Sequence, residues 1–149
     1  MIKAVIFDWM GTLYEKGIGV YNDSRETLEA LKDGGIKMSL ISLSKEPNKR
    51  KLQIAGSGLE TYFDVVVVDE KKSEIQYHAC MHLMSSDTRT TLIVDDRTKR
   101  GIKIGNSIFC KTAWIQRGEY AHESPDAETG EPTYTIETVS KILPIVFKI

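Results

Sequence analysis

Short apolar runs rich in β-branched residues alternate with helical segments along the chain, and this alternation limits the possible folds more than any other feature. The strand-like runs are Lys3–Phe7, Ile36–Ser42, Phe63–Val68, Thr90–Asp96 and Phe109–Gln116. Strand, helix and strand in succession form right-handed parallel units. We therefore expect an α/β fold: a three-layer, Rossmann-like parallel sheet with helices on both faces, formed by residues 1–149 as a single domain.

Helix signals lie between these runs. Asp23, followed three residues later by Glu26, has the pattern of a capping box before a helix that stops at Gly34. Pro47 opens a second helix that ends at Gly56. Further helices are predicted over Lys72–Met84, Thr98–Ile104 and 136–147, and the turn-rich, acidic residues 119–135 are predicted to form a surface loop.

The charge and hydropathy of the chain exclude several classes of protein. A net charge of −1 gives no general attraction to nucleic acid, so no sequence-specific nucleic-acid partner is expected. No run reaches the roughly 18 apolar residues of a membrane span, and no leader precedes the first strand, so we expect a cytoplasmic protein with no membrane partner. The two cysteines, Cys80 and Cys110, are expected to be reduced and buried.

Polar residues stand at the carboxyl ends of the expected strands, where open parallel sheets bind ligands. They are Asp8, Ser42 with Ser44, the segment Asp69–Lys72, and Asp95 with Asp96. Carboxylates that face one another need a cation between them, and a hard ion such as Mg²⁺ is suitable. Hydroxyls and a lysine bind phosphoryl oxygens, and a carboxylate can attack phosphorus. The set indicates phosphoryl chemistry; the alternative is polar residues that only cap loops.

Four stretches resemble, in order, the motifs of the haloacid dehalogenase-like (HAD) superfamily of hydrolases. The first is the apolar strand that ends in Asp8 and continues to Gly-Thr-Leu, in "VIFDWMGTLY". The second is Ser42 in "SLISLS", and the third is a lysine in "EKKSEI", where Lys72 is preferred over Lys71. The fourth is the acidic pair in "LIVDD". The resemblance extends from Ile2 to about Gly118.

The resemblance implies a role for each matching residue. Asp8 would be the nucleophile that forms an aspartyl-phosphate, with Ser42 and Lys72 as the other catalytic residues. The implied cofactor is Mg²⁺, held by Asp8, the backbone carbonyl of Met10, Asp96 and the adjacent Asp95. The expected substrate-binding residues are Gly11, Thr12, Leu43, Ser44 and Trp9, although Trp9 could instead pack in the core. Many relatives have a further acid where this chain has Arg100.

Met10 is the largest departure from the family pattern. Phosphatases of this type have an aspartate there, which protonates the leaving oxygen and then activates water. Met10 keeps the backbone carbonyl but lacks the proton donor. Three outcomes stay open: a phosphatase for substrates with good leaving groups, a donor supplied from elsewhere with Tyr14 nearest in sequence, or a protein that binds a phosphorylated ligand or partner and hydrolyses little.

A cap domain is not expected, because residues 9–41, only 33 residues, separate Asp8 from Ser42. Dehalogenase and phosphonate-hydrolase chemistry is therefore disfavoured, since those relatives close a cap over a small substrate. A capless site suits a large phosphorylated macromolecule, or a small phosphorylated molecule enclosed by a neighbouring subunit of a homo-oligomer. The favoured interpretation is a capless, magnesium-dependent phosphohydrolase.

Overall fold

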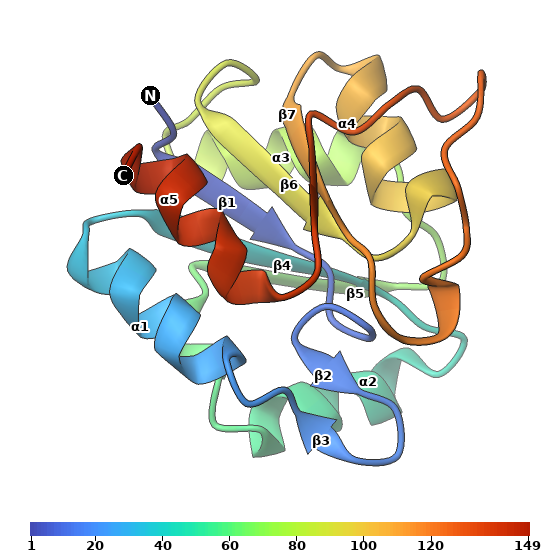
Figure 1. Cartoon of the computed structure of the whole chain (residues 1–149). Coiled ribbons are helices and arrows are strands. Elements are labelled where there is room, and N and C mark those ends of the chain that lie inside the picture. Colours follow the sequence, from blue (N-terminus) through green and yellow to red (C-terminus); the bar gives the residue numbers. More distant parts are fainter.

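A six-stranded sheet with all strands parallel forms the centre of the computed structural model, which describes residues 1–149 (Figure 1). Its strands are β1 (Ala4–Phe7), β4 (Lys37–Leu43), β5 (Val65–Asp69), β6 (Thr91–Asp95), β7 (Lys111–Ile115) and β8 (Tyr134–Ile136), in the order β5-β4-β1-β6-β7-β8. β1 is paired on both sides, with β4 and β6. This order brings the ends of β4, β1 and β6 next to one another.

Helices cover both faces of the sheet, as the sequence predicts. They are α1 (Ser24–Asp33), α2 (Pro47–Gly56), α3 (Glu74–Leu83), α4 (Lys103–Ser107) and α5 (Ile142–Phe147), joined by single turns η1 (Glu60–Tyr62), η2 (Thr98–Ile102), η3 (Gly118–Tyr120) and η4 (Val139–Lys141). Figure 1 shows α1 and α5 on one side of the sheet and α3 on the other. None of the helices has both the length and the apolar character needed to cross a lipid bilayer.

The alternation of side chains along β1 divides the core into two layers. Val5 and Phe7 pack in the larger cluster with residues of α1 and α5, while Ala4 and Ile6 face the cluster of α3. Such two-sided burial explains why the strands read as continuous apolar runs. Cys80 and Cys110 lie in the α3 layer, and both are free thiols, as expected.

A small hairpin follows β1 in place of an inserted domain. Its strands are β2 (Tyr14–Glu15) and β3 (Gly19–Val20), which pair antiparallel. We call residues 14–21 the flap. The chain between β1 and β4 thus consists of the flap and α1, and the chain between β4 and β5 consists of α2 and η1. No separate domain stands over the strand ends, in agreement with the expectation of a capless core.

The expected capping box at the start of α1 is wrong. Asp23 occupies the N-cap position but makes no side-chain capping bond. Its carboxylate instead accepts a hydrogen bond from the backbone amide of Ser140 at 3.0 Å and pairs with Arg117 at 3.5 Å. The capping box of this protein is on α3, where Ser73 and Gln76 bond reciprocally. Contacts with Ser140 and Arg117 therefore take the place of the capping bond that the local sequence predicts for Asp23.

The carboxyl-terminal part also differs from expectation. Residues 134–136, which span the end of the expected loop and the start of the expected helix, form the edge strand β8, and the last helix begins only at Ile142. β8 forms because its β-branched and aromatic residues pair with the free edge of β7. Part of the segment 119–135 is packed against the core rather than loose on the surface, since Thr129 is buried and its carbonyl accepts a bond from Asn106 at 2.9 Å.

Candidate active site

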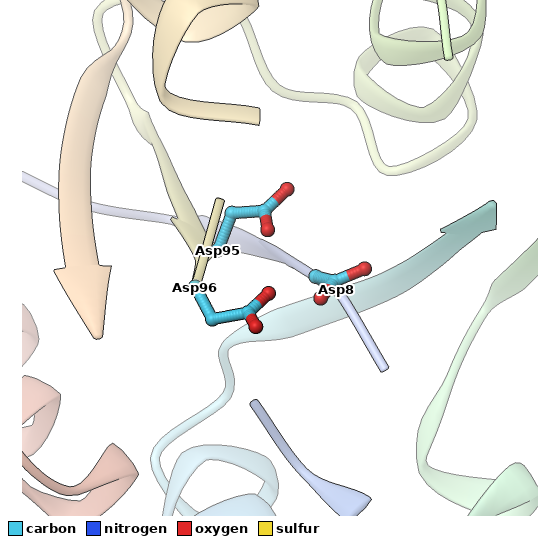
Figure 2. A group of neighbouring side chains, drawn as sticks. All are labelled: Asp8, Asp95 and Asp96. Atoms are coloured by element: carbon cyan, nitrogen blue, oxygen red, sulfur yellow. The ribbon is translucent and has the colours of Figure 1, made fainter. Parts of the chain in front are cut away.

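Three carboxylates meet at the carboxyl ends of β1 and β6. Asp8 follows β1, Asp95 is the last residue of β6, and Asp96 follows it. One oxygen of each carboxylate lies within 4.8 Å of the others (Figure 2). All three residues are buried. The pairing of β1 with β6 therefore brings together the carboxylates that the sequence predicted as one site.

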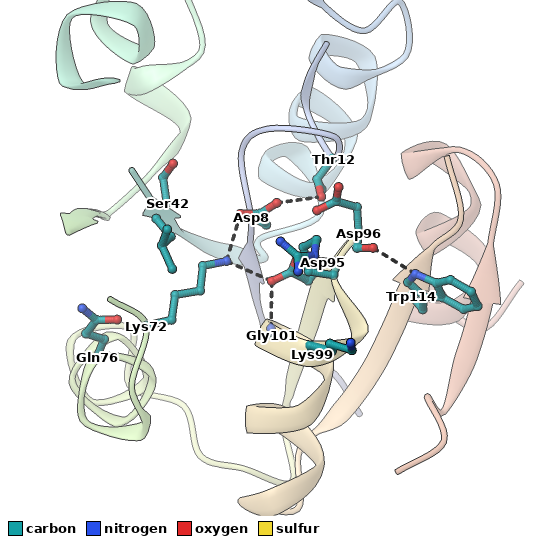
Figure 3. Close-up of polar contacts among 12 residues, drawn as sticks. Asp8, Thr12, Ser42, Lys72, Gln76, Asp95, Asp96, Lys99, Gly101 and Trp114 are labelled. Atoms are coloured by element: carbon teal, nitrogen blue, oxygen red, sulfur yellow. Dashed lines mark hydrogen bonds and ion pairs between the residues drawn. The ribbon is translucent and has the colours of Figure 1, made fainter. Parts of the chain in front are cut away.

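Lys72 lies between two of these carboxylates (Figure 3). Its Nζ is 2.9 Å from Oδ1 of Asp8 and 2.9 Å from Oδ2 of Asp95. Burial by itself would lower the pKa of Lys72, but the two carboxylates raise it well above the ordinary value. The ammonium group is thus permanently charged and held in place. Lys71 is exposed and has no contact with the carboxylates, so Lys72 is the lysine of this site.

Asp95 accepts three hydrogen bonds from the protein. Its Oδ1 accepts a bond from the backbone amide of Arg97 at 2.9 Å, and its Oδ2 accepts one from the amide of Gly101 at 3.0 Å in addition to Lys72. The amide of Gly101 belongs to η2, a single π-helical turn directly after β6. Asp95 therefore holds Lys72 and the η2 turn.

Asp96 has no such partners. Its Oδ1 is buried and accepts no hydrogen bond, while its backbone carbonyl accepts one from the indole N–H of Trp114 at 3.0 Å. Gly11 lies so close that a Cβ there would be 2.1 Å from Oδ2 of Asp96. Burial and the charges of Asp8 and Asp95 raise the pKa of Asp96 to about 11. A buried carboxylate with an unused oxygen, facing other carboxylates, suits a bound hard cation.

Asp8 stays ionised in this surrounding. Burial alone would raise its pKa, but the charge and hydrogen bond of Lys72, together with hydrogen bonds from Asp96 and the backbone of Trp9, leave the pKa below the ordinary value. Thr12 donates a long hydrogen bond of 3.4 Å to Oδ2 of Asp8. The carboxylate of Asp8 is consequently charged and oriented at the end of the central strand.

The hydroxyl of Ser42 lies at the end of β4, beside Asp8. It is almost fully buried and accepts a hydrogen bond of 2.6 Å from Nη1 of Arg50, a residue of α2. The neighbouring Ser44 has a different task, because its hydroxyl accepts a bond from the backbone amide of Glu46 at 3.1 Å in the turn before α2. Ser44 is therefore engaged in a local turn, whereas Ser42 is held by Arg50.

A cavity of about 350 Å³ opens over Asp8 and Asp96. Its walls are formed by the flap, the start of α2, η2 and the segment after β7. The lining residues are Asp8, Met10, Gly11, Glu15, Lys16, Tyr21, Leu43, Arg50, Asp96, Arg97, Arg100, Gly118, Glu119 and Tyr120. The volume is that of a small-molecule site.

Three residues considered for the surroundings of the site do not line the cavity. Trp9 and Thr12 are fully buried and have no surface on the cavity. Trp9 donates its indole N–H to Gln53 at 2.9 Å and stacks on Tyr14, with 5.3 Å between ring centroids. Tyr14 is held in that stack and does not line the cavity either, so it does not replace the missing acid of position 10. The phenols that reach the cavity are those of Tyr21 and Tyr120.

Arg117 connects the flap to the rest of the site. Its guanidinium donates to the backbone carbonyl of Thr12, lies 3.5 Å from the ring centroid of Tyr21 and pairs with Asp23. A second arginine, Arg97, is held by Glu123 at 2.9 Å. No sequence signal distinguishes Arg117, since a single arginine after a strand is ordinary.

The sequence of this chain matches a known protein family. The chain belongs to the haloacid dehalogenase-like hydrolase family, whose sequence profile matches residues 1–115. No curated protein sequence matches the chain significantly.

Solved structures share the fold at low sequence identity. A Clostridium difficile protein described as a phosphatase is 17% identical, with a TM-score of 0.82 over 97% of this chain and 98% of that one. A 2-haloacid dehalogenase from Pseudomonas syringae is 14% identical, with a TM-score of 0.80 over 99% of both chains. YfnB from Bacillus subtilis, a HAD-type hydrolase bound to magnesium, is 16% identical, with a TM-score of 0.71 over 86% of this chain and 56% of that one.

Proposed function

We propose that this hydrolase is a magnesium-dependent phosphatase that acts through an aspartyl-phosphate on Asp8. The observation that supports the proposal most directly is the state of the Asp8 carboxylate. It is ionised, held by Lys72 at 2.9 Å, and lines a cavity of small-molecule size. A charged, fixed carboxylate at the floor of a cavity is the arrangement that nucleophilic catalysis requires.

The residues suited to hold Mg²⁺ are Asp8, Asp96 and the backbone carbonyl of Met10. Asp96 has a buried oxygen without a partner, and Asp95 is occupied by N–H donors, so Asp96 is the better ligand of the acidic pair. A magnesium ion bound there would neutralise the carboxylates and polarise a phosphoryl oxygen. The magnesium bound to the YfnB structure is in line with this assignment.

The chain's own groups account for the transfer of the phosphoryl group. An oxygen of Asp8 attacks phosphorus, the bond from phosphorus to the leaving oxygen breaks, and that oxygen takes a proton from solvent. Water then attacks the phosphorus of the aspartyl-phosphate, which releases inorganic phosphate and frees Asp8. Lys72 keeps Asp8 ionised, and the hydroxyl of Ser42 donates to a phosphoryl oxygen.

Met10 limits which substrates the proposed mechanism can hydrolyse. Its side chain lines the cavity beside Asp8, where it offers no proton. Positioned acids and bases contribute roughly 100-fold to 10,000-fold to rate. The proposed substrates are therefore small phosphorylated molecules with good leaving groups, such as acyl phosphates. The same observation supports a second candidate, a binding protein for phosphorylated ligands with little turnover.

Turnover of acetyl phosphate and p-nitrophenyl phosphate, with and without Mg²⁺, tests the proposal. The wild type should release phosphate only with the metal, and Asp8→Asn should abolish release. Asp64→Asn is the matched control, because this exposed carboxylate makes only a 4.0 Å contact with Lys37, away from the site. Tight phosphate binding without turnover would support the binding protein, and halide release from 2-haloacids would instead support dehalogenation.

A further inference from the structure

Three cations that line the cavity, Lys16, Arg50 and Arg100, form no salt bridge, and of these only Arg50 is fixed by side-chain hydrogen bonds, one of them to Ser42. Lys72 is shared between two carboxylates, so its single positive charge is already more than balanced. Arg97, likewise, is paired with Glu123. An anion that entered beside Asp8 would meet the unbalanced charge of Arg50.

The guanidinium of Arg50 is fixed and only partly used. Nη1 donates to Oγ of Ser42 at 2.6 Å and to the carbonyl of Leu43 at 3.2 Å, which uses both of its hydrogens. Nη2 and Nε make no hydrogen bond, and neither is among the buried atoms without a partner, so both stay accessible. Two neighbouring nitrogens of a fixed guanidinium match two oxygens of a phosphoryl group.

The bond from Arg50 also determines what Ser42 can do. Because Oγ of Ser42 accepts the hydrogen bond from Arg50, its own proton is free, and no group of the protein accepts it. A phosphoryl oxygen beside Asp8 would receive that proton as a hydrogen bond (Figure 3 shows Ser42 and Asp8 on neighbouring strand ends). Arg50 and Ser42 thus form a donor pair directed at one anion.

We propose that Arg50 is the phosphoryl-binding cation of this site, acting with Ser42 while Lys72 serves to hold Asp8. This assignment rests on the proposed function, and it adds a residue outside the four sequence motifs. Burial lowers the pKa of Arg50, and the negative charge of Asp8 opposes that shift. The ligand class is a phosphate monoester or acyl phosphate whose terminal group carries two negative charges.

Binding of inorganic phosphate in the presence of Mg²⁺, measured by calorimetry, tests the assignment without turnover. Arg50→Gln should weaken binding by roughly 10-fold to 100-fold, since hydrogen bonds between charged groups are lost. Arg50→Lys should recover part of the lost phosphate affinity. Lys51→Gln is the matched control, because it removes the same charge from an exposed neighbour on α2, and it should bind within about twofold of the wild type.

Chemical rescue separates a phosphoryl contact from a merely structural role. Added guanidinium ion at millimolar concentration should restore acetyl phosphate turnover in Arg50→Ala but should not affect Lys51→Ala. Equal phosphate affinity in Arg50→Gln and Lys51→Gln, or no phosphate binding by the wild type, would overturn the assignment. If phosphate binding depends on Arg50 but the wild type hydrolyses nothing, the assignment stands and the proposed phosphatase function fails.

Discussion

The backbone amide of Gly101 lies 3.0 Å from Oδ2 of Asp95, and a Cβ on residue 101 would lie 2.2 Å from that same oxygen. The η2 turn therefore approaches the carboxylate closely only because residue 101 is a glycine. Since Asp95 also holds Lys72 at 2.9 Å, the turn helps to position the lysine that keeps Asp8 ionised.

Substitution of Gly101 by alanine should displace Asp95 and loosen Lys72. We expect Gly101→Ala to lower the free energy of unfolding by about 1–3 kcal/mol and to remove most magnesium-dependent turnover. Urea unfolding and acetyl phosphate assays measure the two effects. Gly56→Ala is the control, because a Cβ there meets no atom within 4 Å, and it should be neutral or slightly stabilising. Equal behaviour of the two variants would refute the role of the close approach.

The carboxylate cluster should make stability fall as pH rises when no metal is present. Burial and neighbouring charges raise the pKa of Asp95, and they raise that of Asp96 to about 11, against 3.8 for an ordinary aspartate. Between these values the folded protein binds more protons than the unfolded chain, so higher pH favours unfolding. In EDTA, the melting temperature should be several degrees lower at pH 8 than at pH 5.5, since 1 kcal/mol corresponds to roughly 2–4 °C.

Mg²⁺ should restore the melting temperature mainly at pH 8. The metal ion binds the carboxylates in their deprotonated form, and protons compete with it at lower pH. Thermal melts at both pH values, with EDTA or Mg²⁺, measure the effect. Asp96→Asn should reduce both the pH dependence and the response to Mg²⁺. A melting temperature in EDTA that is the same at pH 5.5 and pH 8 would contradict the expected titration.

Restoring an acid at position 10 should increase turnover selectively. Met10→Asp places a carboxyl group beside Asp8 in the cavity, and we expect turnover of an alkyl phosphate such as glycerol phosphate to rise by up to roughly 100-fold. Turnover of acetyl phosphate should rise much less, because its leaving group needs little protonation. Met10→Asn is the matched control without an acid, and a similar gain in that variant would exclude proton donation as the cause.

Arg117 should contribute more to stability than other arginines, because it joins three segments. Its side chain is only 15% exposed, pairs with Asp23 and packs on Tyr21. We expect Arg117→Ala to cost about 2–3 kcal/mol in urea unfolding. Arg89→Ala is the control: this side chain is 89% exposed in its pair with Asp87 and should cost less than about 0.5 kcal/mol. Equal costs would show that the Arg117 contacts add nothing.

The motif residues of the site could be predicted from sequence because they stand at or near strand ends. Parallel topology then brings these ends together at one edge of the sheet. Asp8 and Asp96 directly follow β1 and β6, and Ser42 is the last residue but one of β4; these three strands are neighbours in the sheet. The burial of Trp9 also follows from a local pattern. Val5, Phe7 and Trp9 belong to the same core cluster, so the alternation of β1 extends one residue beyond the acid and already indicates a buried Trp9.

Other features depend on contacts that no local pattern contains. β8 has only three residues and forms because β7 offers a free edge, and the carboxylate of Asp23 turned to Arg117 and Ser140, partners more than 90 residues away. Arg50 was visible only as one charge in a basic cluster. Its separation of four residues from the buried Ile54 placed it on the inward side of α2, which is the signal that distinguishes it from its exposed neighbours.

The flap and the segment after β7 supply much of the cavity wall, whereas the reactive groups stand on the sheet and the turns at its edge. Chemistry and recognition are therefore encoded in separate stretches of the gene. Redesign of the substrate contacts can begin with codons 15–21 and 118–120, whereas a new leaving group also involves codon 10.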